Sequence, residues 1–245
     1  MQPRHLEKAP IREAVVDIQC QLPDDVSVSF LESLHDSIAS KYPQKKVRRR
    51  IESAVKVEKG EIQATTNDFG VDGFQFISKD STQIVQFRLD GFTFSRLAPY
   101  ESWERTRDEA LRLWQIYRKA TSPISIDRVA LRYINQLSLP VAEGNWEHWL
   151  IAPPRAPEGV PPRIEFLTRS VFEDPATETV WLLAQGAQRP DSPAARSNVL
   201  LDIDVSKTAR FDDDPLIWET MEVLREIKNR LFFGSLTDAT LETLV

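Results

Sequence analysis

Five charged residues in predicted strands have the types and spacing that could do chemistry: Arg88, Arg128, Arg132, Asp202 and Asp204. Arg128 and Arg132 are four residues apart in the sequence, and the two aspartates are two residues apart. Each of these pairs therefore shares one face of its strand, because side chains alternate along a strand. Facing inward, the arginines could bind an anionic or nucleotide-like small molecule, and the carboxylates could bind a divalent cation. Facing outward, the same residues form the polar face of a half-solvated sheet, which period-two alternation alone favours.

A second candidate is the most basic run of the chain, in a predicted loop between the first helix and the next strand: Lys45, Lys46, Arg48, Arg49 and Arg50. Such a run could contact the phosphates of nucleic acid. No stacking aromatic residue is interleaved with it, which favours a solvated loop or a surface that meets an acidic partner. The 31 Lys and Arg residues are outnumbered by 37 Asp and Glu, giving a net charge of -6. A global basic field for nucleic acid is therefore absent.

The standard catalytic and cofactor motifs are missing. The chain has eight glycines and contains no phosphate loop, dinucleotide fingerprint, His-Glu-x-x-His or Gly-x-Ser-x-Gly. A single cysteine, Cys20, and three scattered histidines argue against a metal site. We therefore expect no cofactor and no metal ion, and the sequence leans towards a protein that is not an enzyme.

The predicted elements recur in one order along the chain. The first half contains a strand at 11–21, a helix at 29–42, strands at 51–57, 70–78 and 82–97, and a helix at 102–120. The second half contains a strand at 124–139, a short helix at 145–150, strands at 163–171, 180–187 and 198–205, and a helix at 215–233. This order predicts an α+β fold, with a mainly antiparallel sheet and helices on one side. Two β-α-β-β-β-α halves, 10–121 and 124–245, would form a single co-folded unit.

Two apolar segments have open interpretations. Residues 92–104 are dense in aromatic side chains around a strand-to-helix turn, which could form a ligand wall or a core corner where Tyr100 and Trp103 pack. The C-terminal segment 235–245 would expose several apolar side chains unless it docks on the body or on a partner.

The chain resembles a sporadically distributed, uncharacterised family of bacterial proteins of similar length. The matching blocks are residues 9–14, 91–97, 99–100, 103–104, 131–135, 139–140, 202–204, 232–233 and 235–238. The resemblance implies one co-folded unit and a gene of patchy distribution, which is compatible with accessory or defence-type gene pairs. It brings no catalytic residue and no cofactor.

The composition is that of an ordinary globular protein, with 41% hydrophobic and 28% charged residues. The sequence contains neither a signal-peptide core nor an apolar stretch of membrane-spanning length. We therefore expect a cytoplasmic, non-enzymatic binding protein that acts through a protein partner and not through a membrane. The alternative is an enzyme or ligand-binding protein that uses the arginine and aspartate residues. A weaker alternative is nucleic-acid binding through the basic run.

Overall fold

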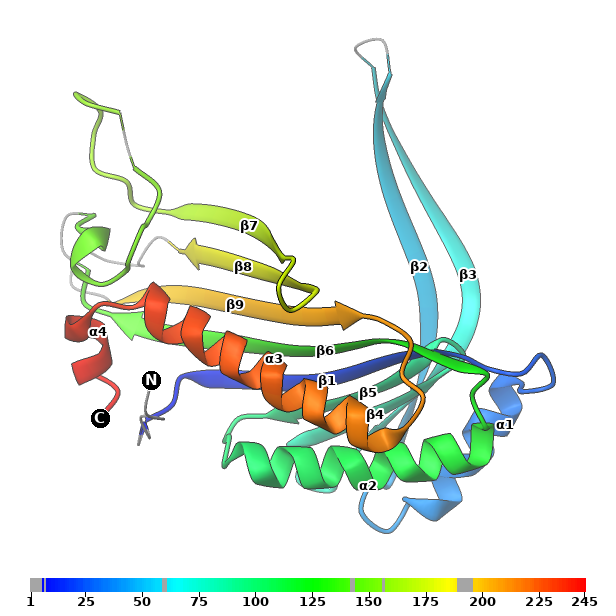
Figure 1. Ribbon diagram of the computed structural model, residues 1–245. Helices are drawn as coiled ribbons and strands as arrows, with labels where there is room; N and C mark the ends of the chain where they lie inside the picture. The colour runs from blue at the N-terminus through cyan, green and yellow to red at the C-terminus, as the bar shows by residue number, and fades with distance from the viewer. Residues whose placement is uncertain (1–5, 7, 59–60, 142–143, 156, 189–195) are drawn as a thin grey trace.

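A computed structural model describes residues 6, 8–58, 61–141, 144–155, 157–188 and 196–245. In this part of the chain, nine strands form one antiparallel sheet with the order β2-β3-β4-β5-β1-β6-β9-β8-β7 (Figure 1). The strands are β1 (Ile11–Gln21), β2 (Gln44–Glu58), β3 (Glu61–Ile77), β4 (Gln83–Arg88), β5 (Gly91–Leu97), β6 (Ser125–Leu139), β7 (Phe166–Asp174), β8 (Thr179–Ala187) and β9 (Ser197–Thr208).

The helices cover one face of this sheet (Figure 1). They are α1 (Val28–Ser33), α2 (Trp103–Thr121), α3 (Asp214–Ser235) and α4 (Asp238–Glu242), with 3-10 turns η1 (Leu34–Ser37) and η2 (Trp146–His148). Helix α1 packs on β3 and β4, α2 on β5 and β1, and α3 on β6 and β9. The predicted α+β fold, with an antiparallel sheet and helices on one side, is confirmed. We call the opposite side of the sheet the open face.

Capping and spacing explain the two long helices. Ser102 caps α2 by accepting a hydrogen bond from the backbone N–H of Arg105, and Asp213 caps α3 in the same way. The buried side chains of α2 recur at steps of three and four residues, which places them on one face. Trp114 and Tyr117 of this face meet Phe92 of β5 in the core.

The segment predicted as one strand at 82–97 is instead the hairpin of β4 and β5. The chain turns at Leu89 and Asp90, and Arg88 pairs with Gly91. The first half of the chain therefore has four strands after its first helix, and the predicted count of three is wrong. The first strand of each half, β1 or β6, lies at the centre of the sheet with the other strands of that half beside it. The internal duplication stays a prediction.

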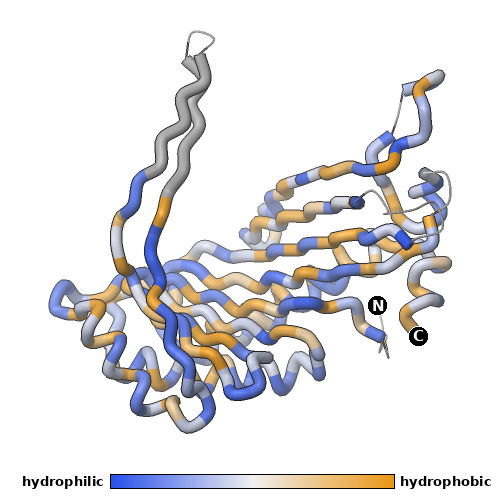
Figure 2. Tube along the Cα trace, turned by 180° about the vertical axis from the view of Figure 1, so that it is seen from behind, coloured by the Kyte–Doolittle hydropathy of each residue, from blue (hydrophilic) through white to orange (hydrophobic). Residues whose placement is uncertain are grey.

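The long β2–β3 hairpin projects away from the body (Figures 1 and 2). The C-terminal segment docks on the body, where Leu236, Leu241 and Leu244 are buried, whereas Val245 remains exposed. Among the described residues, no helix combines the length and the apolar character that crossing a membrane requires.

Candidate functional site

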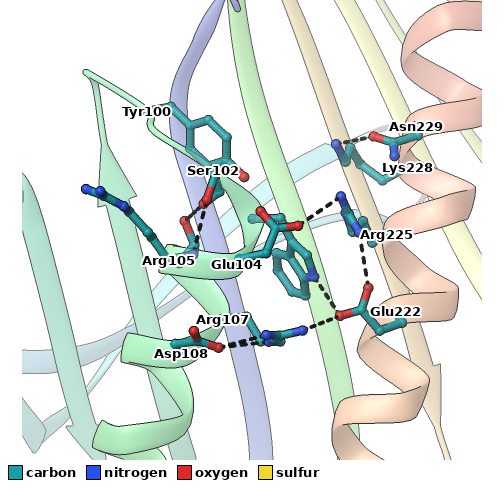
Figure 3. Close-up of polar contacts among 12 residues, drawn as sticks. Tyr100, Ser102, Glu104, Arg105, Arg107, Asp108, Glu222, Arg225, Lys228 and Asn229 are labelled. Carbon is teal, nitrogen blue, oxygen red and sulfur yellow. Dashed lines mark hydrogen bonds and ion pairs between the residues drawn. The ribbon is translucent and has the colours of Figure 1, made fainter. Parts of the chain in front are cut away.

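A pocket of about 630 Å³ lies on the helix-covered side, where the start of α2 meets the C-terminal half of α3 (Figure 3). Its walls come from four separate parts of the chain: residues 6 and 8–11, residues 98–104, strand β6 and helix α3. Aromatic side chains form much of the lining: Tyr100, Trp103, Tyr133, Phe232 and Phe233. The volume falls in the range typical of small-molecule sites.

Backbone hydrogen bonds hold these segments in place. The N–H of Ala98 donates to the carbonyl of Arg12, and the N–H of Gln136 donates to the carbonyl of Pro10. The segment before β1 is also tied to the C-terminal segment, because the N–H of Lys8 donates to the carbonyl of Leu244. The pocket walls are therefore attached to the central strands β1 and β6.

Two tyrosines from different walls share a hydrogen bond. The hydroxyl oxygens of Tyr100 and Tyr133 are 3.2 Å apart, and their rings meet edge to face with centroids 5.9 Å apart. Burial raises the pKa of both hydroxyls above the ordinary value. Both hydroxyls are therefore neutral at physiological pH, and one of them donates a hydrogen bond to the other.

Lys228 of α3 brings an amine to the same place. Its Nζ lies 4.0 Å from the centroid of the Tyr133 ring, within the range of a cation–π contact, and donates to Oδ1 of Asn229 at 2.6 Å. Among the described residues, no carboxylate forms an ion pair with this amine. Burial, with a smaller contribution from the positive charge of Arg225, lowers the pKa of Lys228 from 10.5 to about 7.

The charge of Arg225, in contrast, is balanced. This guanidinium lies 3.6 Å from Glu104 of α2 and 3.3 Å from Glu222 of its own helix (Figure 3). Glu222 also accepts a hydrogen bond from the Trp103 indole at 2.7 Å and pairs with Arg107 at 3.3 Å. These contacts link α2 to α3 and leave Lys228 as the cation of this helix pair that faces the pocket without a carboxylate partner.

Replacing Lys228 with methionine, which has a similar length and no charge, is expected to stabilise the fold in a pH-dependent way. Between pH values of about 7 and 10.5 the unfolded chain binds more protons at this site, so the stability of the wild type rises with pH across that window. The variant lacks this dependence. Urea unfolding should show a gain of about 2–3 kcal/mol near pH 6 that shrinks towards zero near pH 10. A gain that is constant with pH would contradict the lowered pKa, and Lys119→Met on the exposed side of α2 serves as the control.

The five strand residues predicted as a ligand site lie together on the open face. Arg132 donates two hydrogen bonds to Asp202, at 2.9 and 2.6 Å, and Arg128 lies 4.0 Å from Asp204. Arg88 is buried and pairs with Asp17 of β1 at 3.0 Å. Burial raises the pKa of Asp204, whose Oδ1 has no hydrogen-bond partner. These side chains form cross-strand pairs with one another, and their ligand-binding role stays a prediction.

The basic run lies in a strand, so its predicted loop is wrong. All five fall within β2, where Lys45, Lys46, Arg48 and Arg49 each lie opposite a residue of β3 and Arg50 lies at a register shift. Lys45 forms an ion pair with Glu32 of α1, and Arg48 and Arg49 form ion pairs with Asp72 and Asp68 of β3. Arg50 lies over the Phe69 ring. Charged residues are common on edge strands because they discourage pairing with other chains. Nucleic-acid binding by this run stays a prediction.

The sequence had indicated only part of the pocket. The aromatic turn at residues 92–104 was interpreted as a ligand wall or as a core corner. Tyr100 and Trp103 fit both interpretations, because they pack against the core and also line the pocket. Arg225, Lys228 and Tyr133 were not singled out, because nothing in the helix pattern separates a pocket-facing lysine from a solvated one. Five of the segments that carry the family resemblance contribute residues to this pocket: 9–14, 99–100, 103–104, 131–135 and 232–233.

Comparison with known proteins finds no protein family and no curated protein that matches the chain. The family resemblance therefore stays a prediction. In the described part of the chain, no group of three or more His, Cys, Asp or Glu residues could hold a metal ion.

Proposed function

We propose that this chain is a cytoplasmic, non-enzymatic binding protein whose open face receives a segment of a protein partner over β7, β8 and β9. The observation that carries this proposal is a patch of exposed apolar side chains on these strands. Leu167 is 76% exposed, Val171 50%, Val180 41% and Leu200 39%. Hydrophobic residues recur along these strands in Figure 2.

The strand register places these side chains on one face. Leu167 lies opposite Gly186, which lies opposite Leu200, and residues directly opposite in antiparallel strands share a face. Val171 lies opposite Leu182 in the same way, and Leu182 lies opposite Asp204. On β9, Leu200, Asp202 and Asp204 share this face, so the apolar side chains lie beside the arginine and aspartate pairs. Several large apolar side chains exposed on one face mark interaction sites in many proteins.

Strand β7 also offers a free edge. In the described part of the chain it pairs with β8 alone, so its other side presents unpaired backbone groups. Such an edge accepts an extended segment as an added strand. The other edge of the sheet, β2, exposes Val47 and Ile51 among the cations of the basic run, whereas β7 exposes Leu167 and Val171 with the single cation Arg169 between them. This difference favours β7 as the edge that pairs.

The charges on β7 define the partner further. Arg169 and Glu173 lie on the open face with Leu167 and Val171, because these residues are two apart along the strand. A matching segment would carry apolar residues at alternate positions, with a carboxylate opposite Arg169 and a cation opposite Glu173. The partner is therefore an extended segment of a second protein with mixed charge.

The double variant Leu167→Asp/Val171→Asp is expected to weaken partner binding by about a hundredfold, because it places charge in the centre of the apolar patch. Both positions are at least half exposed, so its stability should remain within about 0.5 kcal/mol of the wild type. The partner would first be identified as a stoichiometric protein that co-purifies from the host after nuclease treatment in moderate salt. Binding to the purified partner is then measured by calorimetry, and protection of β7 amides by hydrogen exchange.

Val223→Asp, on the exposed side of α3, is a control of similar exposure (43%) and should bind normally. Equal binding by the double variant, or protection that spares β7, would refute the proposal. Co-purification of no stoichiometric protein would also refute it. Light scattering that shows a homodimer, abolished by the double variant, would replace the second protein with another copy of this chain.

A further inference from the structure

We propose that the pocket between α2 and α3 binds a small organic acid, one carboxylate on an apolar and preferably aromatic body. The Lys228 amine and the Tyr100–Tyr133 hydroxyl pair would hold the carboxylate. This site goes beyond the proposed partner surface, because it lies on the helix-covered side of the sheet and uses none of the residues of β7, β8 or β9.

The geometry supplies several donors around one ring. The Lys228 amine lies 4.0 Å from the centroid of the Tyr133 ring, and the hydroxyl of that ring shares a hydrogen bond with Tyr100. An ammonium group with neighbouring hydroxyl donors is a suitable partner for carboxylate oxygens. The neighbouring Arg225 adds positive potential, although its own ion pairs are formed with Glu104 and Glu222.

The balance of charge favours a single negative charge on the ligand. Among the described residues, two carboxylates line the pocket, and both are paired: Glu104 with Arg225, and Glu101 with Arg96 and Arg105. The remaining cations of the lining are Lys228 and Lys8, whose Nζ donates to the main-chain oxygen of Val245. A phosphate dianion would meet the two glutamates with little spare positive charge to offset them. A monocarboxylate is the better match.

The walls select the body of the ligand. Ile11, Pro99, Trp103 and Phe232 contribute apolar surface to the lining. Aromatic walls favour flat apolar groups through stacked or edge-to-face contacts. The volume of about 630 Å³ accommodates one aromatic ring system with a short acidic side chain.

Binding of an acid should depend on pH through Lys228. A bound carboxylate favours the charged amine, so binding near neutral pH takes up a proton. Among the described residues, the other titratable or charged groups of the pocket lining are Tyr100, Tyr133, Arg225, Lys8, Glu101 and Glu104. A variant that removes only the Lys228 amine distinguishes the titration of this amine from the titration of the other groups.

The test is calorimetry of the full chain with indole-3-acetate, phenylacetate and octanoate, each compared with its neutral amide, and with phenyl phosphate. At least one acid should bind about tenfold or more tightly than its amide near pH 6, and lose about tenfold or more in affinity by pH 9. Near pH 8, titration in two buffers of different ionisation enthalpy should show uptake of close to one proton.

Lys228→Met should abolish both the preference for acid and the pH dependence, and Lys228→Arg should keep the preference while losing the pH dependence. The control Lys119→Met should behave as wild type. The proposal fails if none of the acids binds with a Kd below about 1 mM, if acid and amide bind equally, or if phenyl phosphate binds more tightly than every acid. The two proposals can be tested separately. The Lys228 variants should bind the protein partner normally, and the Leu167/Val171 double variant should bind the acid normally.

Discussion

Replacing Asp17 with alanine is expected to lower the free energy of unfolding by about 3 kcal/mol. Asp17 of β1 lies between two arginines, with Arg88 at 3.0 Å and Arg128 at 3.4 Å, and also accepts a hydrogen bond from Thr93. The Arg88 side chain is only 10% exposed, so water cannot replace the lost carboxylate. Without Asp17, the buried Arg88 keeps only Asp90 as a carboxylate partner among the described residues, at 2.9 Å, and the Asp90 side chain is 51% exposed. Breaking a buried pair in this way is costly because the remaining buried charge is less well compensated. Urea unfolding at neutral pH measures the effect.

Asp202→Ala is the matched control for this prediction. It removes the two hydrogen bonds from Arg132, but the Arg132 side chain is 47% exposed and can be hydrated again. The expected cost is therefore about 1 kcal/mol. An equal loss of unfolding free energy in Asp17→Ala and Asp202→Ala would show that the burial of Arg88 does not determine the contribution of its ion pair.

Gly91→Ala should destabilise the fold by about 4 kcal/mol or more, or prevent folding. Gly91 begins β5 with a φ of 146°, a backbone conformation that residues with a Cβ rarely adopt. A Cβ at this position would lie 2.2 Å from the carbonyl oxygen of Ile18 and 3.0 Å from the Cα of Gln19, both in the central strand β1. Neither backbone atom can move without breaking the pairing of β5 with β1. Circular dichroism during urea titration should show the loss.

Gly70→Ala isolates the steric contribution. Gly70 also has a positive φ, of 84°, but a Cβ there would meet no atom within 4 Å. Its expected cost is about 1 kcal/mol from backbone strain alone. A Gly91 variant no less stable than the Gly70 variant would mean that the β5 and β1 backbones can separate at this point without penalty.

Local patterns predicted the central elements well, because each of these carries a strong signal. Alternation identified β1 and β6, and the caps and spacing of apolar residues identified α2 and α3. The β4–β5 hairpin was missed although Asp90-Gly91 is a common hairpin dipeptide. Apolar residues alternate on both sides of the turn, so the two strands looked like one. The start of β2 was missed because its run of charged residues lacks the apolar alternation that identifies a strand. These residues form a strand because their backbone pairs with β3 in the sheet.

The candidate sites were predictable only in part. Alternation showed that Arg132 and Asp202 lie in strands, but the distances that pair them depend on β6 and β9 being neighbours. Lys228 follows the buried Ile227 in a helix with many charged residues. Its amine differs from the others only because Tyr133, more than ninety positions earlier in the chain, lies beneath it. Long-range proximity of this kind has no local signature in a sequence.

The central position of β1 also has a consequence for how the chain acquires its structure. Strand β1 pairs on one side with β5 and on the other with β6, which ends at Leu139, more than a hundred residues later in the chain. The apolar residues Ala14, Val16 and Ile18 therefore stay without their final neighbours until residue 139 has been synthesised. Non-local pairing of this kind slows folding, and exposed strands promote aggregation meanwhile. A fragment that stops before β6 should therefore precipitate or bind chaperones, and the yield of native protein should depend on how quickly residues 125–139 emerge from the ribosome.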